Sequence, residues 1–287
     1  VPHHAVFMTW QASLSLAYTT QTRIGQAHTT ARFQHTGPLR ILQSLYPEGP
    51  GICHNVLVHP PGGLVGGDTL DLEVSVADGA HGLITTPGAT RFYRSEGAPA
   101  LQRSHLRLAG NARLEWLPLE SIAYSGCMAE NRITMELAPS AQLMGWDITA
   151  LGLPAANAPF ERGRYQQHLE LPGVWLERGR IAADDERLLN SPAGLAGHRC
   201  LATLFWVCGS EISRARRERA LELARALLPP LGTDLAAGAT APNAQVVAMR
   251  VLSPLVEPAM RLLKAVRNAW RVNLWGLPAT QPRAWST

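Results

Sequence analysis

Apolar and polar residues alternate through most of this chain. In residues 70–76, leucine and valine occupy one side of the pattern, while Asp71 and Glu73 fall on the other. Residues 13–18 alternate in the same way. Because successive side chains of a strand point to opposite faces, this period of two predicts half-buried strands. Glycine, proline, asparagine and aspartate between the runs mark turns, so we expect residues 11–210 to be mostly β.

A strand–turn–strand pattern repeats within this region. Each copy has an apolar-x-apolar-Ala stretch, two turn residues, another alanine and a second strand that begins with an apolar residue. The copies cover residues 74–83, 106–114 and 135–143, and residues 169–176 resemble a shorter fourth copy. A repeat of roughly 30 residues is typical of stacked β coils, although the regular hairpins of a β-sandwich give a similar pattern.

The last quarter of the chain has helical periodicity instead. One apolar stripe runs through residues 211–228 and ends at two prolines. Ser253 and Pro254 then provide an N-cap and a first-turn proline for a second helix of roughly five turns. This helix either packs on its own sheet or docks a partner, with Trp275 and the tail exposed. Its apolar stripe ends at Trp270, and the opposite face carries Arg261, Lys264, Arg267 and Arg271.

Together these patterns predict an all-β protein with minor α content. We expect residues 1–210 to form a stacked, flattened β-helix-like body, either a solenoid or a sandwich. Residues 211–287 are expected to complete the same domain with two helices and a strand.

Composition narrows the classes of partner. The chain is 46% apolar and 17% charged, which is typical of a globular protein. Its 26 basic residues include one lysine, and arginine is enriched at protein interfaces. The basic cluster at 214–219 is interrupted by glutamate and predicts a solvated helix face, not a nucleic-acid surface. We find neither a signal peptide nor a bilayer-spanning run, so we expect a cytoplasmic protein without membrane contact.

The most distinctive segment is HPPGGLVGGDTL at residues 59–70. Its two prolines and four glycines predict an ordered loop that feeds directly into a strand. The loop begins with His59 and contains Asp68, and Cys53 and His54 lie just upstream. Thiol, imidazole and carboxylate groups are ligands for borderline divalent metals such as nickel or zinc. These four residues are therefore candidate ligands, with a tight structural turn and hydrogen-bonded histidines as the alternative.

Two long strings carry a resemblance to a known family. HPPGGLVGGD occupies residues 59–68, and TPGATRFYRS occupies residues 86–95. Shorter matches include Trp146-Asp147 and the tail at 283–287. On these segments the chain resembles, nearly end to end, the family of urease accessory proteins called UreD or UreH.

The resemblance implies a flattened helical stack of strands with two helices toward the C-terminus. It also implies a scaffold and not an enzyme. Proteins of this family bind the accessory protein UreF, which recruits the GTPase UreG, and they bind apo-urease and help deliver nickel to its active site. Nickel would be cargo moving through water-filled passages, with no cofactor held tightly.

By motif position, the candidate residues along that route are Asp68, Asp147 and Glu177, with Cys53, His54 and His59 as additional ligands. A transfer route needs several weak ligands because the ion must leave as well as enter. The alternatives are an ion pair of Glu177 with a neighbouring arginine, Arg178 or Arg180, and a turn cap at Asp147.

Candidate partner-binding residues come from two segments. The second long string combines arginine with tyrosine, which are the residue types of interface hot spots. The same residues could instead brace one coil internally. The candidates are Arg91, Tyr93 and Arg94 from that string, and Arg261, Lys264, Arg267, Trp270 and Arg271 from the predicted second helix.

Two other function classes fit an all-β chain of this kind. One is a carbohydrate-active enzyme on a β-helix, and the other is a generic β binding module. The sequence has no G-x-S-x-G string and no glycine-rich phosphate loop, which weighs against the enzyme. Turnover without urease would favour the enzyme, whereas co-purification with a GTPase and apo-urease would exclude the plain module.

Overall fold

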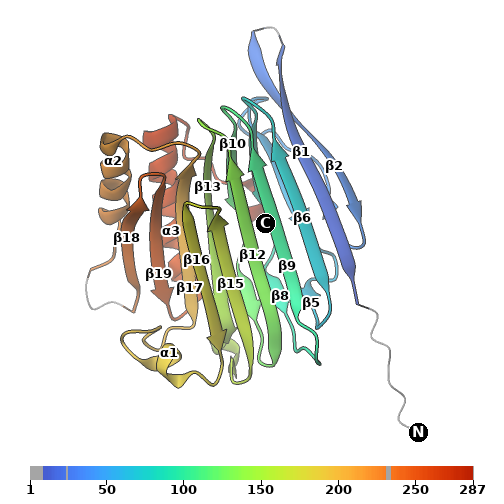
Figure 1. The fold of residues 1–287 in the computed structure, drawn as a ribbon, viewed down its shortest axis with the longest axis vertical. Coiled ribbons are helices and arrows are strands. Elements are labelled where there is room, and N and C mark those ends of the chain that lie inside the picture. The colour runs from blue at the N-terminus through green and yellow to red at the C-terminus, as the bar shows by residue number, and fades with distance from the viewer. Residues whose placement is uncertain (1–8, 24, 231–233, 287) are drawn as a thin grey trace.

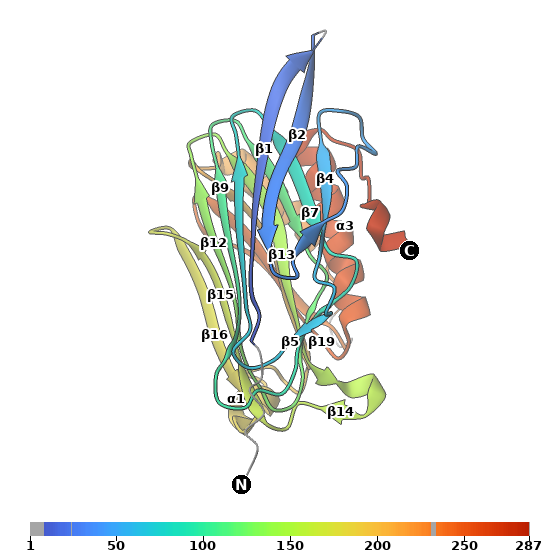
Figure 2. The same ribbon diagram turned by 90° about the vertical axis from the view of Figure 1, so that its right-hand side faces the viewer.

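Two β-sheets face each other across an apolar core (Figure 1). The computed structural model describes residues 9–23, 25–230 and 234–286. Figure 2 shows the sheets as two layers, with helix on the outer side of the second sheet. In order across the first sheet, the strands are β16 (Trp175–Ala182), β15 (Gly163–Leu171), β12 (Cys127–Leu137), β9 (Ala100–Leu108), β6 (Thr69–Val76), β1 (Gln11–Arg23) and β2 (Gln26–Thr36).

The second sheet contains the partner strand of each coil. Its main path is β18 (Ala236–Asn243), β19 (Val246–Ser253), β17 (Cys200–Cys208), β13 (Gln142–Leu153), β10 (Arg113–Leu117), β7 (His81–Thr85), β4 (Cys53–Val58) and β3 (Arg40–Ile41). The short strands beside this path are β5 (Gly63–Leu64), β8 (Thr90–Phe92), β11 (Ser121–Ala123) and β14 (Ala158–Pro159).

The three clear copies of the repeat are three stacked coils. Each copy places one strand in each sheet, as β6–β7, β9–β10 and β12–β13. Corresponding strands run parallel and in register, so that Val76, Leu108 and Leu137 align. Neighbouring turns also contact each other, since the backbone N–H of Asn111 donates to Asp78 Oδ1 at 2.8 Å. The solenoid-like interpretation of the sequence repeat is confirmed.

The proposed fourth copy is wrong. Residues 169–176 form the turn of an antiparallel hairpin, β15–β16, in which Leu171 pairs with Trp175. Both strands therefore lie in the first sheet. Gly173 turns the chain with φ of 73°, a conformation that favours glycine. The hairpin ends the stack on this side instead of starting another coil.

Helices cover the outer face of the second sheet. These helices are α2 (Arg214–Arg225) and α3 (Val256–Trp275). The short helix α1 (Glu186–Asn190) instead buries Leu189 in the core between the sheets, and η1 (Pro154–Ala156) and η2 (Arg283–Ser286) are 3-10 turns. α2 packs against β18 and β19, and α3 packs against β13, β17 and β19, so that their apolar stripes form a second core separate from the one between the sheets. Among the described residues, no helix is long and apolar enough to cross a membrane.

The second predicted helix packs on its own sheet, but its start differs from the prediction. Ser253 is the last residue of β19 and is paired with Cys200, so it cannot cap a helix. α3 begins after Leu255, which provides no side-chain cap. Trp275, which the alternative of a partner-docking helix left exposed, is buried at 6% exposure, and the tail folds back so that Trp285 stacks on Trp146.

Candidate functional site

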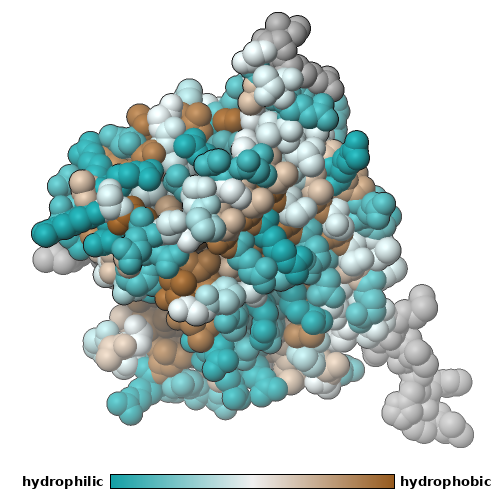
Figure 3. Space-filling model, turned by 45° about the horizontal axis from the view of Figure 1, so that its top comes forward, coloured by the Kyte–Doolittle hydropathy of each residue, from teal (hydrophilic) through white to brown (hydrophobic). Residues whose placement is uncertain are grey.

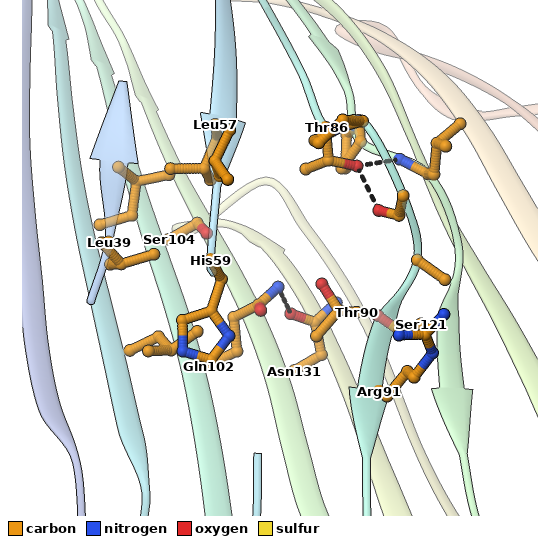
Figure 4. Close-up of a pocket in the computed structure, with 18 of the residues that line it drawn as sticks. Leu39, Leu57, His59, Thr86, Thr90, Arg91, Gln102, Ser104, Ser121 and Asn131 are labelled. Carbon is orange, nitrogen blue, oxygen red and sulfur yellow. Dashed lines mark hydrogen bonds between the residues drawn. The ribbon is translucent and has the colours of Figure 1, made fainter. Parts of the chain in front are cut away.

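A cavity of about 260 Å³ lies between the two sheets. This volume accommodates several water molecules. Figure 4 shows side chains from both sheets and from the intervening loops around it, among them His59, Gln102, Arg91 and Ser121. The polar residues that line it are His59, Thr86, Thr90, Arg91, Gln102, Ser104, Ser121, Asn131 and Asp147.

Asp147 is the acid of this cavity. Alternation along β13 turns Trp146 toward the helices and Asp147 toward the space between the sheets. Asn131 Nδ2 donates to Oδ1 at 2.8 Å, and Gln167 Nε2 donates to Oδ2 at 2.7 Å. Burial, assisted by the charge of Glu177, raises the pKa of Asp147 to about 6 despite these two amides. The alternative of a turn cap is wrong, because Asp147 lies in the middle of a strand.

The amides around Asp147 belong to an ordered ladder. Gln102, Asn131 and Gln167 align on β9, β12 and β15, and Gln102 Nε2 donates to Asn131 Oδ1 at 3.2 Å. On the second sheet, Thr203 aligns with Asp147 and Arg250 aligns with Thr203.

Glu177 extends this set of polar groups to the edge of the stack. Thr203 Oγ1 donates to its Oε1 at 2.6 Å, and Arg250 Nε donates to its Oε2 at 2.8 Å. The ion pair therefore involves Arg250 and not the neighbouring arginines on β16 that the sequence suggested. We use the term polar row for this set, which runs from the interior to the exposed Arg250: Gln102, Asn131, Gln167, Asp147, Thr203, Glu177 and Arg250.

Asp68 holds the glycine-rich loop in place. It is 2% exposed and accepts the backbone N–H of Trp10 at 2.7 Å and of Val65 at 2.9 Å. It does not line the cavity. The loop needs glycine where its backbone passes close to another part of the chain. A Cβ on Gly66, for example, would lie 2.6 Å from the carbonyl oxygen of Ala98. For Asp68 the structure thus matches the alternative of a tight structural turn.

The other candidate ligands do not converge. His59 lines the cavity, and burial lowers its pKa. Cys53 points toward Tyr46 Oη at 3.5 Å, whereas His54 Nε2 lies 2.9 Å from Glu48 Oε1. Within the described residues, no group of three or more His, Cys, Asp and Glu side chains could hold a metal ion. The structure therefore does not bring Cys53, His54, His59 and Asp68 together, because β4 sends adjacent side chains to opposite faces.

Comparison with known proteins decides the family. Residues 11–286 match the family described as UreD urease accessory protein. This chain belongs to the UreD family. It is 64% identical over 280 residues to the urease accessory protein UreD of Variovorax paradoxus strain S110, covering 98% of this chain and 100% of that protein.

Other UreD proteins agree along their full length. The one from Polaromonas sp. strain JS666 is 63% identical over 279 residues, covering 97% of this chain and 100% of the relative. The one from Methylibium petroleiphilum strain PM1 is 49% identical over 298 residues, covering 98% and 100%. The resemblance read from the two long strings is confirmed, and family membership supports a role in urease maturation.

This UreD-family chain also contains a buried charge network that sequence reasoning missed. Glu115 on β10 accepts Arg267 Nε at 2.8 Å and Arg271 Nε at 3.0 Å, while Arg271 Nη2 lies 2.7 Å from Glu48 Oε2. Burial alone would raise the pKa of Glu115, but Arg267, His81 and Arg271 lower it to about 2. This network joins α3 to the sheet.

Three of the predicted partner-binding residues of this UreD-family chain are buried beneath α3 and not exposed. Arg267, Trp270 and Arg271 are fully buried, and Trp270 Nε1 donates to the carbonyl of Ala220 at 2.8 Å. They cannot form an exposed docking face in this structure. Lys264 is half-buried over the ring of Trp285. The remaining candidates are exposed and stay predictions: Arg91, Tyr93, Arg94 and Arg261.

Proposed function

We propose that this UreD-family protein is the scaffold of a urease-maturation complex and passes nickel toward apo-urease. In this proposal it binds a UreF-type protein, a UreG-type GTPase through that protein, and apo-urease. It works in the cytoplasm and carries out no reaction of its own. The observation that supports the proposal best is the polar row, which extends from the cavity between the sheets to the edge of the stack.

The chemistry of the row suits an ion in transit. Carboxylate, amide and hydroxyl oxygens bind divalent ions with modest strength, and His59 adds one imidazole at the cavity. Asp147 is largely ionised near neutral pH, since its pKa is about 6. An ion that meets one or two such groups at each position is attracted but not trapped, in contrast to an ion inside a closed four-ligand site.

The direct test removes the two carboxylates of the row. Glu177→Gln and Asp147→Asn preserve shape, so we expect the double variant to fold and to bind its partners. Urease activation should fall by about tenfold or more, corresponding to roughly 1.4 kcal/mol or more. Activation is measured as urease activity and as nickel bound per urease active site, after incubation of apo-urease with nickel and the complete set of accessory proteins.

A matched control changes two acids on the outer face of the first sheet, Glu73→Gln and Glu136→Gln, whose side chains are both 51% exposed. This control should activate urease normally. Full activation by the double variant of the row would contradict the route. Asp68, an obvious target from sequence, is a poor choice because its loss would disturb the loop it holds.

A further inference from the structure

The second sheet extends beyond the first at one end of the stack. β19 and β18 continue past β17, whereas the first sheet ends at β16 (Figure 1). Gly238 pairs with Arg250, and Thr240 pairs with Ala248, which belongs to the core between the sheets. The inward face of these strands is therefore left uncovered. We name this surface the β18–β19 ledge: Ala236, Gly238, Thr240 and Arg250, which are exposed, and the half-buried Leu252.

β16 presents a free edge beside the ledge. In the part of the chain that the structure describes, β16 is paired only with β15. Such an edge offers unpaired backbone N–H and C=O groups to another strand. A Cβ placed on Gly179 of β16 or on Gly238 would meet no atom within 4 Å, so there is room for a side chain at each of these positions. Figure 3 shows apolar surface within the recess on this side of the molecule.

Arginines predominate around this edge, and the acid on the neighbouring strand, Glu170 of β15, is paired with His168. Arg178 and Arg180 are exposed on the outward face of β16, and Arg250 lies on the ledge. The acid between them, Glu177, is already paired with Arg250. A strand added to β16 would turn alternate side chains toward the ledge and toward the arginines. The fitting occupant has small apolar residues on one side and acidic residues on the other.

We propose that the free edge of β16 and the β18–β19 ledge bind an extended acidic segment of apo-urease, which adds to the first sheet as a further strand. Strand addition of this kind obtains affinity from backbone hydrogen bonds and specificity from alternate side chains. The inference rests on the proposed function, because it takes the edge as the end of the route where nickel leaves.

The pairing of Glu177 is the reason for assigning the acceptor to this edge. Arg250 occupies one carboxylate oxygen of Glu177, at the outer end of the polar row. A carboxylate on the incoming segment competes for Arg250 and leaves Glu177 free to contact the ion. The route therefore opens at this end only when the acceptor is in place, which keeps nickel from being released into solution.

Hydrogen exchange and binding measurements test this docking mode. The full-length protein is mixed with apo-urease alone or with the UreF-type partner alone, and exchange of the amides in residues 176–182 is followed. We expect apo-urease to slow this exchange and the UreF-type partner to leave it unchanged. We also expect Gly238→Trp, which fills the ledge, and the pair Arg178→Glu with Arg180→Glu each to weaken apo-urease binding about tenfold or more.

Matched controls place the same changes elsewhere on the first sheet, as Ser15→Trp on β1 and Arg32→Glu on β2, both at exposed positions. These should bind apo-urease like the wild type, and all variants should keep the wild-type melting temperature. Unchanged binding by Gly238→Trp, or protection of β16 by the UreF-type partner and not by apo-urease, would overturn the docking mode while leaving the nickel route intact. A wild-type protein that does not bind apo-urease at all would overturn both proposals.

Discussion

At the scale of the residue, Asp147 couples the fold to pH. Its folded pKa of about 6 lies above the ordinary value of 3.8, so the native state retains a proton that the unfolded chain releases. The stability that this proton contributes is complete below about pH 4 and is lost as the pH rises through about 6. For the wild type we expect a loss on the order of 2 kcal/mol over that range, measured by urea unfolding.

The Asp147→Asn variant should not show this loss, because the amide does not titrate. The comparison of the two proteins at each pH isolates Asp147 from other titrating groups. Equal slopes of unfolding free energy against pH in both proteins would contradict the assignment of this titration to Asp147.

Asp68 has a different physical role, although it occupies a prominent place in the sequence. It accepts two backbone N–H groups that would otherwise lie unpaired next to the loop. We expect Asp68→Ala to lower the free energy of unfolding by about 2 kcal/mol, within the usual cost of leaving buried donors unpaired. Asp71→Ala, at a side chain 47% exposed, is the control and should change stability little. A stable Asp68→Ala protein would show that solvent readily replaces this carboxylate.

At the scale of the element, the attachment of α3 depends on one buried acid. Replacing Glu115 by glutamine leaves Arg267 and Arg271 buried without their shared countercharge, which typically costs about 3–5 kcal/mol. We expect Glu115→Gln to lower the melting temperature and to speed amide exchange throughout α3. Glu218→Gln removes a pair with Arg214 whose side chains are 54% and 84% exposed, so it should have almost no effect. Unchanged exchange in α3 would contradict the anchoring role of Glu115.

The coils could be predicted from sequence because their signals are local. Alternation fixes which side chains face inward, and the alanines and turn residues recur with each coil. The hairpin at 169–176 has the same local pattern. Only the antiparallel pairing of its two strands, in which Leu171 lies opposite Trp175, distinguishes it from a coil. Local sequence does not determine to which sheet the chain returns after a turn.

The charge network could not be predicted, since Glu115 lies 152 residues before Arg267. A signal was nevertheless present in the helix itself. Arg267 and Arg271 follow Leu263 at spacings of four residues, and such residues lie on the same face of a helix. Both arginines therefore lie beside the buried apolar stripe. The prediction that they share the opposite face with Arg261 and Lys264 did not take this spacing into account.

At the scale of the whole molecule, the candidate site is a product of stacking. Asp147 and Glu177 could be selected by motif position, but their relation depends on Thr203 in β17, which is the register partner of Asp147 and donates a hydrogen bond to Glu177 on the other sheet. The amide ladder depends in turn on the register between β9, β12 and β15. A single strand carries no information on that register, so the row becomes visible only when the coils are assembled.

The same dependence on assembly applies to the last residues of the chain, which fasten the helical layer to the β stack. Trp285 stacks on Trp146 at 5.4 Å, and its Nε1 donates to Thr85 Oγ1 at 2.9 Å. Lys264 of α3 lies over the same ring, 4.5 Å from its centre. Because one side chain joins the helix, β7 and β13, we expect Trp285→Ala to lower the free energy of unfolding by about 2–3 kcal/mol in denaturant titrations. Trp10→Ala, at a tryptophan 46% exposed, should cost far less. Equal losses in the two variants would mean that the tail covers the sheet without fastening it.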